Sequence, residues 1–181
     1  MRRAPAPQLL ALMGAECTGK TTLARALAEQ LGGLWVPERL RDFCAEHGRV
    51  PQPHEQRRIL LAQLRTQRQA LTQARHLGIR WVLCDTTALQ TACYSEHYFG
   101  QTGLYRRAHA LHTRYTLTLL LAPDLPWQAD GVQRDGEAAQ QAVHRLLERA
   151  LAQGGHRSKT ISGQGTQRLA AALAALAHPL A

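Results

Sequence analysis

A glycine-bounded loop near the start of the chain, Gly14-Ala15-Glu16-Cys17-Thr18-Gly19-Lys20-Thr21, limits the fold more than any other part of the sequence. An apolar run, Leu9–Met13, precedes the loop, and after it leucines recur every four residues, at Leu23, Leu27 and Leu31. This pattern predicts a strand, the loop and then a helix. The loop fits G-x-x-x-x-G-K-[ST] in the context that this motif requires. The sequence therefore predicts a nucleoside triphosphate site.

The chemistry of such a loop assigns roles to its residues. Successive backbone N–H groups turn inward at a helix N-terminus and bind phosphate. Lys20 would reach the β- and γ-phosphates, and the Thr21 hydroxyl would bind Mg²⁺, so ATP and Mg²⁺ are the expected cofactors. Gly163 lies in the segment Ser162-Gly163-x-Gly165-Thr166, after the last expected strand, where an adenine ring would approach the backbone closely. The predicted nucleotide-binding residues are Gly14, Ala15, Glu16, Cys17, Thr18, Gly19, Lys20, Thr21, Thr22 and Gly163.

The net charge of 22 − 13 = +9 raises the question of a nucleic-acid partner. Only Lys20 and Lys159 are lysines, and the arginines are scattered without a block, which favours phosphate-bearing small molecules over nucleic acid. The longest apolar run is about half of the ~20 residues that span a bilayer, so no membrane partner is expected. Four cysteines without a C-x-x-C pair indicate a reducing compartment, and we expect a cytoplasmic protein.

Strands and helices alternate along the remaining sequence. The expected strands are 9–13, 34–36, 79–85, 115–121 and 159–162, and the expected helices after the first are 38–47, 54–77, 86–97, 102–112, 137–151 and 166–177. This order predicts an α/β fold of the P-loop NTPase type, with a parallel sheet of about five strands between two helical layers, as in nucleoside and nucleotide kinases. We expect one domain over residues 1–181.

Candidate catalytic residues lie outside the loop as well. Asp85 ends a buried strand, where it could order Mg²⁺ or accept the proton of an attacking hydroxyl. Glu38 and Arg41 follow the second strand and could hold substrate hydroxyls, and Glu38 could also assist Asp85. The competing interpretation of Glu38 is an acid that begins a helix. A small-molecule kinase also needs a region that binds the acceptor of the phosphoryl group and a lid that carries an arginine. Residues 38–77 are the expected acceptor-binding region. The polar loop 123–136 is the expected lid, and its Arg134 would stabilise the transferring phosphoryl group.

Five segments, taken in order, resemble the nicotinamide riboside kinase domain of the bacterial NadR family, from about residue 8 to residue 176. They are the loop with Thr22-Leu23, Val36-Pro37-Glu38-Arg39-x-Arg41, Cys84-Asp85-Thr86, Tyr94-Ser95-Glu96 with Tyr98-Phe99-Gly100, and Pro123-Asp124-Leu125-Pro126-Trp127-x-x-Asp130-Gly131. The last segment is the most specific to this family. The resemblance implies ATP-dependent phosphorylation of the ribose 5′-hydroxyl of nicotinamide riboside, which gives nicotinamide mononucleotide.

The resemblance also bears on the predicted lid. Trp127 would stack on the positively charged pyridinium ring, or it anchors the lid by hydrophobic contact. Asp130 would hold substrate hydroxyls, or it forms a turn with Gly131. Family members typically read D-G-x-R here, whereas Arg134 lies one residue further along. Only about seven residues precede the first strand, so we expect no adenylyltransferase activity of the kind that full-length NadR proteins carry.

Two other functions are compatible with the sequence. One is a different nucleoside or small-metabolite kinase of the same fold, because the residues do not identify the base of the acceptor. The other is a P-loop ATPase that acts as a regulatory switch, which the basic stretch Arg57–Arg75 would favour. A solvated helix face is the favoured explanation of that stretch. A GTPase is disfavoured because N-K-x-D and D-x-x-G are missing from the expected places.

Overall fold

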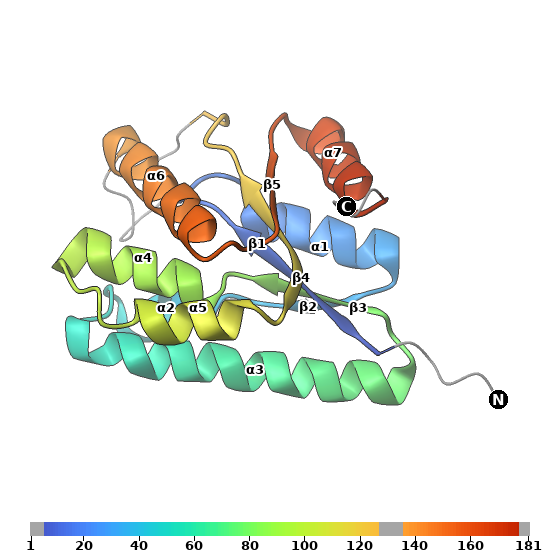
Figure 1. The fold of residues 1–181 in the computed structure, drawn as a ribbon, viewed down its shortest axis with the longest axis horizontal. Coiled ribbons are helices and arrows are strands. Elements are labelled where there is room, and N and C mark those ends of the chain that lie inside the picture. Colours follow the sequence, from blue (N-terminus) through green and yellow to red (C-terminus); the bar gives the residue numbers. More distant parts are fainter. Residues whose placement is uncertain (1–5, 127–135, 178–181) are drawn as a thin grey trace.

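The computed structural model describes residues 6–126 and 136–177 (Figure 1). Strands and helices alternate along most of the chain, as the sequence predicts. The strands are β1 (Gln8–Met13), β2 (Leu34–Val36), β3 (Trp81–Asp85), β4 (Tyr115–Leu121) and β5 (Ser158–Ile161). The helices are α1 (Lys20–Leu31), α2 (Arg39–His47), the short 3-10 helix η1 (Pro53–Glu55), α3 (Gln56–Leu77), α4 (Ala88–Phe99), α5 (Tyr105–His112), α6 (Glu137–Gln153) and α7 (Gly165–Ala177).

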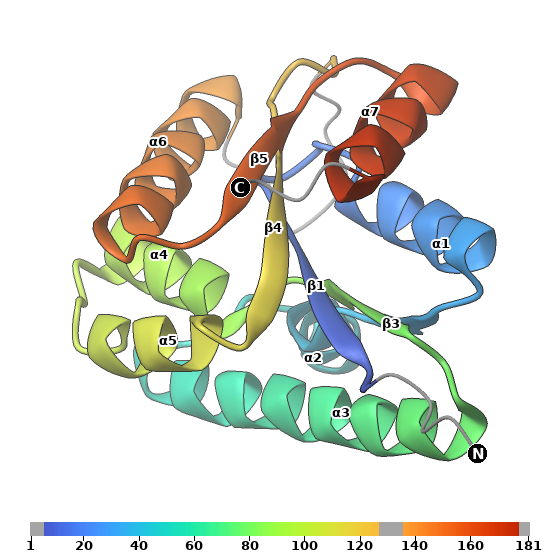
Figure 2. The ribbon, with the colours of Figure 1, turned by 45° about the vertical axis from the view of Figure 1, so that its right-hand side comes forward.

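The five strands form one parallel sheet in the order β2-β3-β1-β4-β5. Figures 1 and 2 show α1 and α7 on one side of this sheet and α3, α4, α5 and α6 on the other. This arrangement confirms the predicted three-layer α/β fold with a parallel sheet of five strands. The strand order reverses between β1 and β3, and ligands of open parallel sheets bind beyond the carboxyl ends of the strands at such a point.

Alternation along the strands divides the core between the two helical layers. Leu10 and Leu12 of β1 pack with α1 and α7, whereas Met13 packs with residues of α3, α4 and α6. Successive side chains of a strand point to opposite faces, so a continuous apolar strand fills both layers. The position of β1 in the middle of the sheet therefore fixes where the loop after Met13 emerges.

Several element ends differ from the sequence predictions by two residues or more. Helix α1 begins at Lys20 rather than Thr22, and α4 begins at Ala88 rather than Thr86. Thr86 adopts a left-handed backbone conformation with φ 80°, and the Thr87 hydroxyl accepts the N–H of Gln90 as the cap of α4. A left-handed threonine between a strand and a helix costs free energy and has no local sequence signal.

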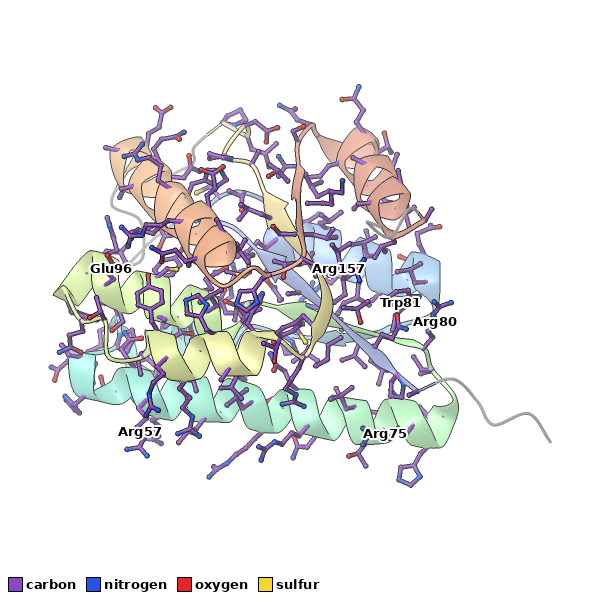
Figure 3. All side chains as sticks on the ribbon, viewed as in Figure 1. Arg57, Arg75, Arg80, Trp81, Glu96 and Arg157 are labelled. Atoms are coloured by element: carbon purple, nitrogen blue, oxygen red, sulfur yellow. The ribbon has the colours of Figure 1, made fainter. Side chains whose placement is uncertain are left out.

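The basic stretch in α3 lies on a solvent-exposed face. Arg57 and Arg75 lie near opposite ends of this helix, as Figure 3 shows, and both side chains are exposed. The opposite stripe of α3 is buried and includes Ile59, Leu64 and Leu71. The amphipathic pattern accounts for the apolar spacing predicted from the sequence. Within the described ranges, no helix is long and apolar enough to cross a membrane.

Three histidines meet where α5, β4 and the turn before β5 come together. The rings of His109 and His156 stack, with 3.0 Å between Nδ1 of His109 and Nε2 of His156. His112 is buried, and its Nε2 lies 2.8 Å from the Thr118 hydroxyl. Burial, together with the neighbouring His156 and His109, lowers the pKa of His112 to about 3. His112 is therefore neutral in the folded protein at pH 7, and the stacked rings contribute to packing.

Acidification is expected to destabilise the fold through His112. The folded state holds this ring neutral down to about pH 3, whereas the unfolded chain takes up a proton near the ordinary value of 6.5. Stability is thus lost as the pH falls from 6.5 toward 3, by about 2 kcal/mol at pH 5 relative to pH 8. Urea unfolding at a series of pH values measures this slope. The slope should flatten in His112→Gln and persist in the control His76→Gln, whose side chain is exposed.

Candidate functional site

The glycine-bounded loop lies at the carboxyl end of β1 and leads directly into α1. Gly19 caps the helix with φ 76°, and Cys17 is also left-handed with φ 58°. A Cβ atom on Gly14 would come within 2.6 Å of the Thr18 hydroxyl oxygen, so only glycine fits there. The N–H of Gly14 donates to Oε1 of Gln90 in α4, at 3.1 Å. The loop therefore has the tight conformation that the motif predicts, and α4 holds its first residue.

Lys20, Thr21 and Asp85 lie together at the start of α1. The Thr21 hydroxyl donates to Oδ2 of Asp85 at 2.5 Å, which joins the loop to the end of β3. Oδ1 of Asp85 is buried and has no hydrogen-bond partner within the part of the chain that the structure describes. Nζ of Lys20 donates to the Ala15 carbonyl at 2.9 Å. A lysine in this position must leave a backbone carbonyl before it binds a phosphate.

The Thr21 and Asp85 oxygens fit a magnesium ion. Mg²⁺ prefers oxygen ligands and usually keeps several waters beside one or two carboxylates and the phosphates of a nucleotide. A hydroxyl beside a carboxylate with one unpaired, buried oxygen matches this donor set. These two residues, which the sequence assigned to the metal, are therefore close enough to act on the same ion.

A cavity of about 420 Å³ opens over the loop and has the composition of a phosphate site. It is lined by Cys17, Thr18, Gly19, Lys20, Thr21, Thr22, Arg41, Leu125 and Pro126. Six of these nine residues belong to the predicted nucleotide-binding set. Arg41, which the sequence assigned to the acceptor, lines this cavity, where an arginine suits phosphate oxygens.

A second cavity, of about 210 Å³, lies beside the first. It is lined by Glu16, Glu38, Leu40, Val50, Pro51, Gln56, Ile59, Gln63, Thr86, Gln90, Thr91, Tyr94, Tyr98 and Phe99. The Tyr94 and Tyr98 rings are 5.9 Å apart and nearly parallel. Burial raises the pKa of Tyr94 well above its usual value, so its hydroxyl is a neutral hydrogen-bonding group. Seven of the fourteen lining residues are apolar or aromatic, and such a mixture of apolar walls and polar groups is typical of a site for a small organic molecule.

Glu38 lies on the wall of this second cavity, at the N-terminal end of α2. Burial raises the pKa of its carboxyl group, Lys20 and Arg41 oppose that effect, and Asp85 adds to it. Lys20 and Asp85 are thus near enough to influence the same carboxyl group. Glu38 joins the two cavities, because it lines one and interacts electrostatically with Lys20, which lines the other.

Gln63 of α3 fixes the backbone on both sides of Glu38. Its Oε1 accepts the N–H of Arg39 at 2.9 Å, and its Nε2 donates to the Pro37 carbonyl at 3.1 Å. The side chain of Gln63 is almost fully buried. Both ends of a buried amide are therefore used to hold the turn that carries Glu38. Sequence reasoning missed this role, since a glutamine in a helix rich in glutamine carries no distinguishing signal.

The loop is also attached to α6. Nε2 of Gln140 donates to the Glu16 carbonyl at 2.7 Å, while Glu16 itself lines the second cavity. Glu16 thus faces the second cavity; the sequence counted it among the nucleotide-binding residues and also allowed it a role in orienting an acceptor or a metal-bound water. Gln140 was not predicted, because a contact across 124 residues has no local pattern.

Three predicted site residues, Trp127, Asp130 and Arg134, lie outside the described residues. Gly163 lies after β5 with φ 93°, and its N–H donates to Oδ2 of Asp124 at 2.7 Å. Aromatic residues of α4 were part of the family resemblance but received no role from the sequence. Tyr94 and Tyr98 are four residues apart, and this spacing could have predicted that both rings lie on one face of a helix.

Comparisons with solved structures give the same fold. A crystal structure of NadR in complex with NR has a TM-score of 0.79 at 21% identity, covering 96% of this chain and 52% of the NadR chain. Deoxyadenosine kinase from M. mycoides with bound dATP has a TM-score of 0.63 at 12% identity, covering 94% of this chain and 100% of the deoxyadenosine kinase chain. Thymidylate kinase from Ehrlichia chaffeensis has a TM-score of 0.64 at 14% identity, covering 96% of this chain and 98% of the thymidylate kinase chain. The chain thus spans about half the length of NadR, and these identities establish the fold alone.

Sequence comparisons define the family. A search of curated proteins gave no significant match. The AAA_28 family, described as an AAA domain, matches residues 9–168, a stretch that includes the glycine-bounded loop, Glu38, Asp85 and both cavities. Because this match takes in most of the 181 residues, the chain belongs to the AAA_28 family of P-loop domains.

Proposed function

We propose that this protein is an ATP-dependent kinase that phosphorylates the 5′-hydroxyl of nicotinamide riboside and releases nicotinamide mononucleotide. The observation that carries the proposal is the pair of adjoining cavities, one phosphate-binding in character and one aromatic, with Glu38 at their junction. A plain ATPase has no need of the aromatic cavity. The likeness in fold to NadR in complex with NR supports the choice of acceptor.

Each cavity supplies one reactant in this proposal. ATP lies with its phosphates over residues 14–22, and Lys20 moves from the Ala15 carbonyl to the β- and γ-phosphates. The pyridinium ring of the acceptor lies among Tyr94, Tyr98 and Phe99, since aromatic faces attract cations. The ribose then extends toward Glu38 and Asp85. This arrangement brings the hydroxyl oxygen near the γ-phosphorus.

The proposed reaction forms one O–P bond and breaks another. The 5′-oxygen attacks the γ-phosphorus, the bond to the β–γ bridging oxygen breaks, ADP leaves, and the proton of the hydroxyl passes to the Glu38 carboxylate. A raised pKa makes Glu38 a better proton acceptor than an ordinary glutamate. Mg²⁺, held by Thr21 and Asp85, would neutralise charge on the phosphates. Lys20 balances the charge that collects on the oxygens as ADP departs.

A panel of acceptors tests the proposal. ADP release with Mg-ATP is measured against nicotinamide riboside, uridine, cytidine, adenosine, deoxyadenosine and thymidine, and mass spectrometry identifies the product. Nicotinamide mononucleotide should be the main product. If the main product were the monophosphate of another nucleoside, nicotinamide riboside would be the wrong acceptor but the kinase assignment would still hold. ADP release that no nucleoside stimulates would overturn the kinase assignment and favour the ATPase switch.

The pH dependence of kcat/KM is expected to report on Glu38. The ionised carboxylate accepts the proton, so activity falls as the pH decreases through a pKa above the ordinary value of 4.5. Glu38→Gln should lower kcat by about 10²-fold and remove this acidic limb. Glu46→Gln is the matched control, because Glu46 is an exposed residue of the same helix. An unchanged acidic limb in Glu38→Gln would exclude Glu38 as the proton acceptor.

A further inference from the structure

Arg168 of α7 lies where three separate segments meet, and its side chain is only 4% exposed. Its Nε donates to the Gly163 carbonyl at 2.7 Å, and Nη2 donates to the Ala122 carbonyl at 3.3 Å. Nη1 donates to the Thr18 carbonyl, and Nη2 also donates to Oδ1 of Asp124. One buried guanidinium therefore joins the glycine-bounded loop, the segment after β4 and the loop after β5.

Asp124 completes the junction from the opposite side. While Oδ1 accepts from Arg168, Oδ2 accepts the N–H of Gly163 at 2.7 Å. The carboxylate thus connects the segment after β4 with the loop after β5, and 34% of its side chain is exposed. Asp124 belongs to the segment most specific to the family resemblance, yet it lines neither cavity. Its contacts indicate a role in holding backbone.

The bond to Thr18 bears directly on phosphate binding. In a trans peptide unit the carbonyl and the next N–H point in opposite directions. Because Arg168 fixes the Thr18 carbonyl on one side, the N–H of Gly19 is directed to the other. Thr18, Gly19 and Lys20 all line the 420 Å³ cavity. Arg168 therefore sets the orientation of a backbone donor in the phosphate loop.

The same junction positions the far wall of that cavity. Leu125 follows Asp124 and lines the cavity, and a Cβ atom built on Gly19 would lie 3.3 Å from its Cδ1. The loop and the segment 122–126 are consequently in close contact at Gly19. A change in the position of Asp124 would move Leu125 relative to the loop.

We infer that Arg168 and Asp124 are a positioning pair that holds the phosphate loop, the segment 122–126 and the loop after β5 in the arrangement that binds a nucleoside di- or triphosphate. The inference deepens the proposed function, on which it rests for the nucleotide but not for the acceptor. Arginine is required because its planar fork reaches acceptors in several directions at once, whereas an ammonium group is a single compact charge. Neither residue needs to touch the nucleotide.

Calorimetric titration with Mg-ADP, without any acceptor, tests the pair. Arg168→Lys is expected to weaken ADP binding by about tenfold, and Asp124→Asn by about fivefold, because each leaves backbone groups of the junction unpaired. Arg149→Gln is the matched control, because it breaks another arginine–carboxylate pair, Arg149–Glu96, neither residue of which lines a cavity. It should leave ADP binding within twofold of the wild type. In steady-state assays KM for ATP should rise while KM for the acceptor stays constant.

A structural role alone would give a different result. It would lower the melting temperature of Arg168→Lys and Asp124→Asn but leave the dissociation constant of ADP within twofold of the wild type, and that result would overturn the inference. If Arg168→Lys does not fold, ADP binding by Asp124→Asn decides between the two results. This variant should fold, because asparagine has nearly the volume of aspartate and the position is partly exposed. Failure of every nucleoside as acceptor would contradict the proposed function, yet weakened ADP binding would still support the pair.

Discussion

Replacing Lys20 by methionine is expected to lower kcat/KM by about 10³-fold, since the ammonium group is the cation of the loop that can follow the transferring phosphoryl group. The fold should survive, because the Ala15 carbonyl keeps a second donor, the Thr18 hydroxyl at 2.8 Å. A coupled assay for ADP release measures the loss, and circular dichroism checks the folded state.

Lys159→Met is the matched control for this variant. Lys159 is the other lysine of the sequence and lies in β5, where it lines neither cavity. Its replacement should leave kcat/KM within about twofold of the wild type. If Lys20→Met kept more than a tenth of the activity, the loop would not be the site of phosphoryl transfer.

Asp85→Asn is expected to be the second severe change, with a fall in kcat of about 10³-fold. The amide oxygen can still accept the Thr21 hydroxyl, so the link between α1 and β3 is preserved. What is lost is the negative charge and the unpaired buried oxygen that fit Mg²⁺. The Mg²⁺ concentration needed for half-maximal activity should therefore rise together with the fall in kcat.

Asp42→Asn provides the comparison for Asp85. It removes the same charge from an exposed pair with Arg39 in α2, and it should leave the magnesium dependence unchanged. A normal magnesium dependence in Asp85→Asn would exclude this carboxylate from the metal site, whatever its effect on kcat.

The parts of this protein that sequence patterns predict are those with a local period. The alternation of apolar strands with helices that carry leucines every four residues predicted the three-layer fold, and the fixed spacing of glycines predicted the loop between β1 and α1. Asp85 could be predicted because a buried strand that ends in an acid is unusual. In each case neighbours in the chain determine the structure.

The residues that escaped prediction act across long distances in the sequence. Arg168 binds the Thr18 carbonyl 150 residues away, and Gln63 holds the backbone beside Glu38 from another helix. Their partners are backbone groups, which have the same chemistry at every position. Thr86 is another such case: it is left-handed, and its N–H donates to the Leu12 carbonyl of β1 at 3.1 Å, a contact that the residue type does not predict.

The two cavities have separate walls. Among the described residues none lines both. The 210 Å³ cavity is built chiefly from α3, α4 and the turn before α2, and the 420 Å³ cavity from residues 17–22, Arg41 and the segment after β4. Substitutions around Tyr94, Tyr98 or Ile59 can therefore alter the shape of one cavity without disturbing the other. If the proposed function holds, the choice of acceptor and the use of ATP can be changed independently, except at Glu38, which lines one cavity and interacts with Lys20 in the other.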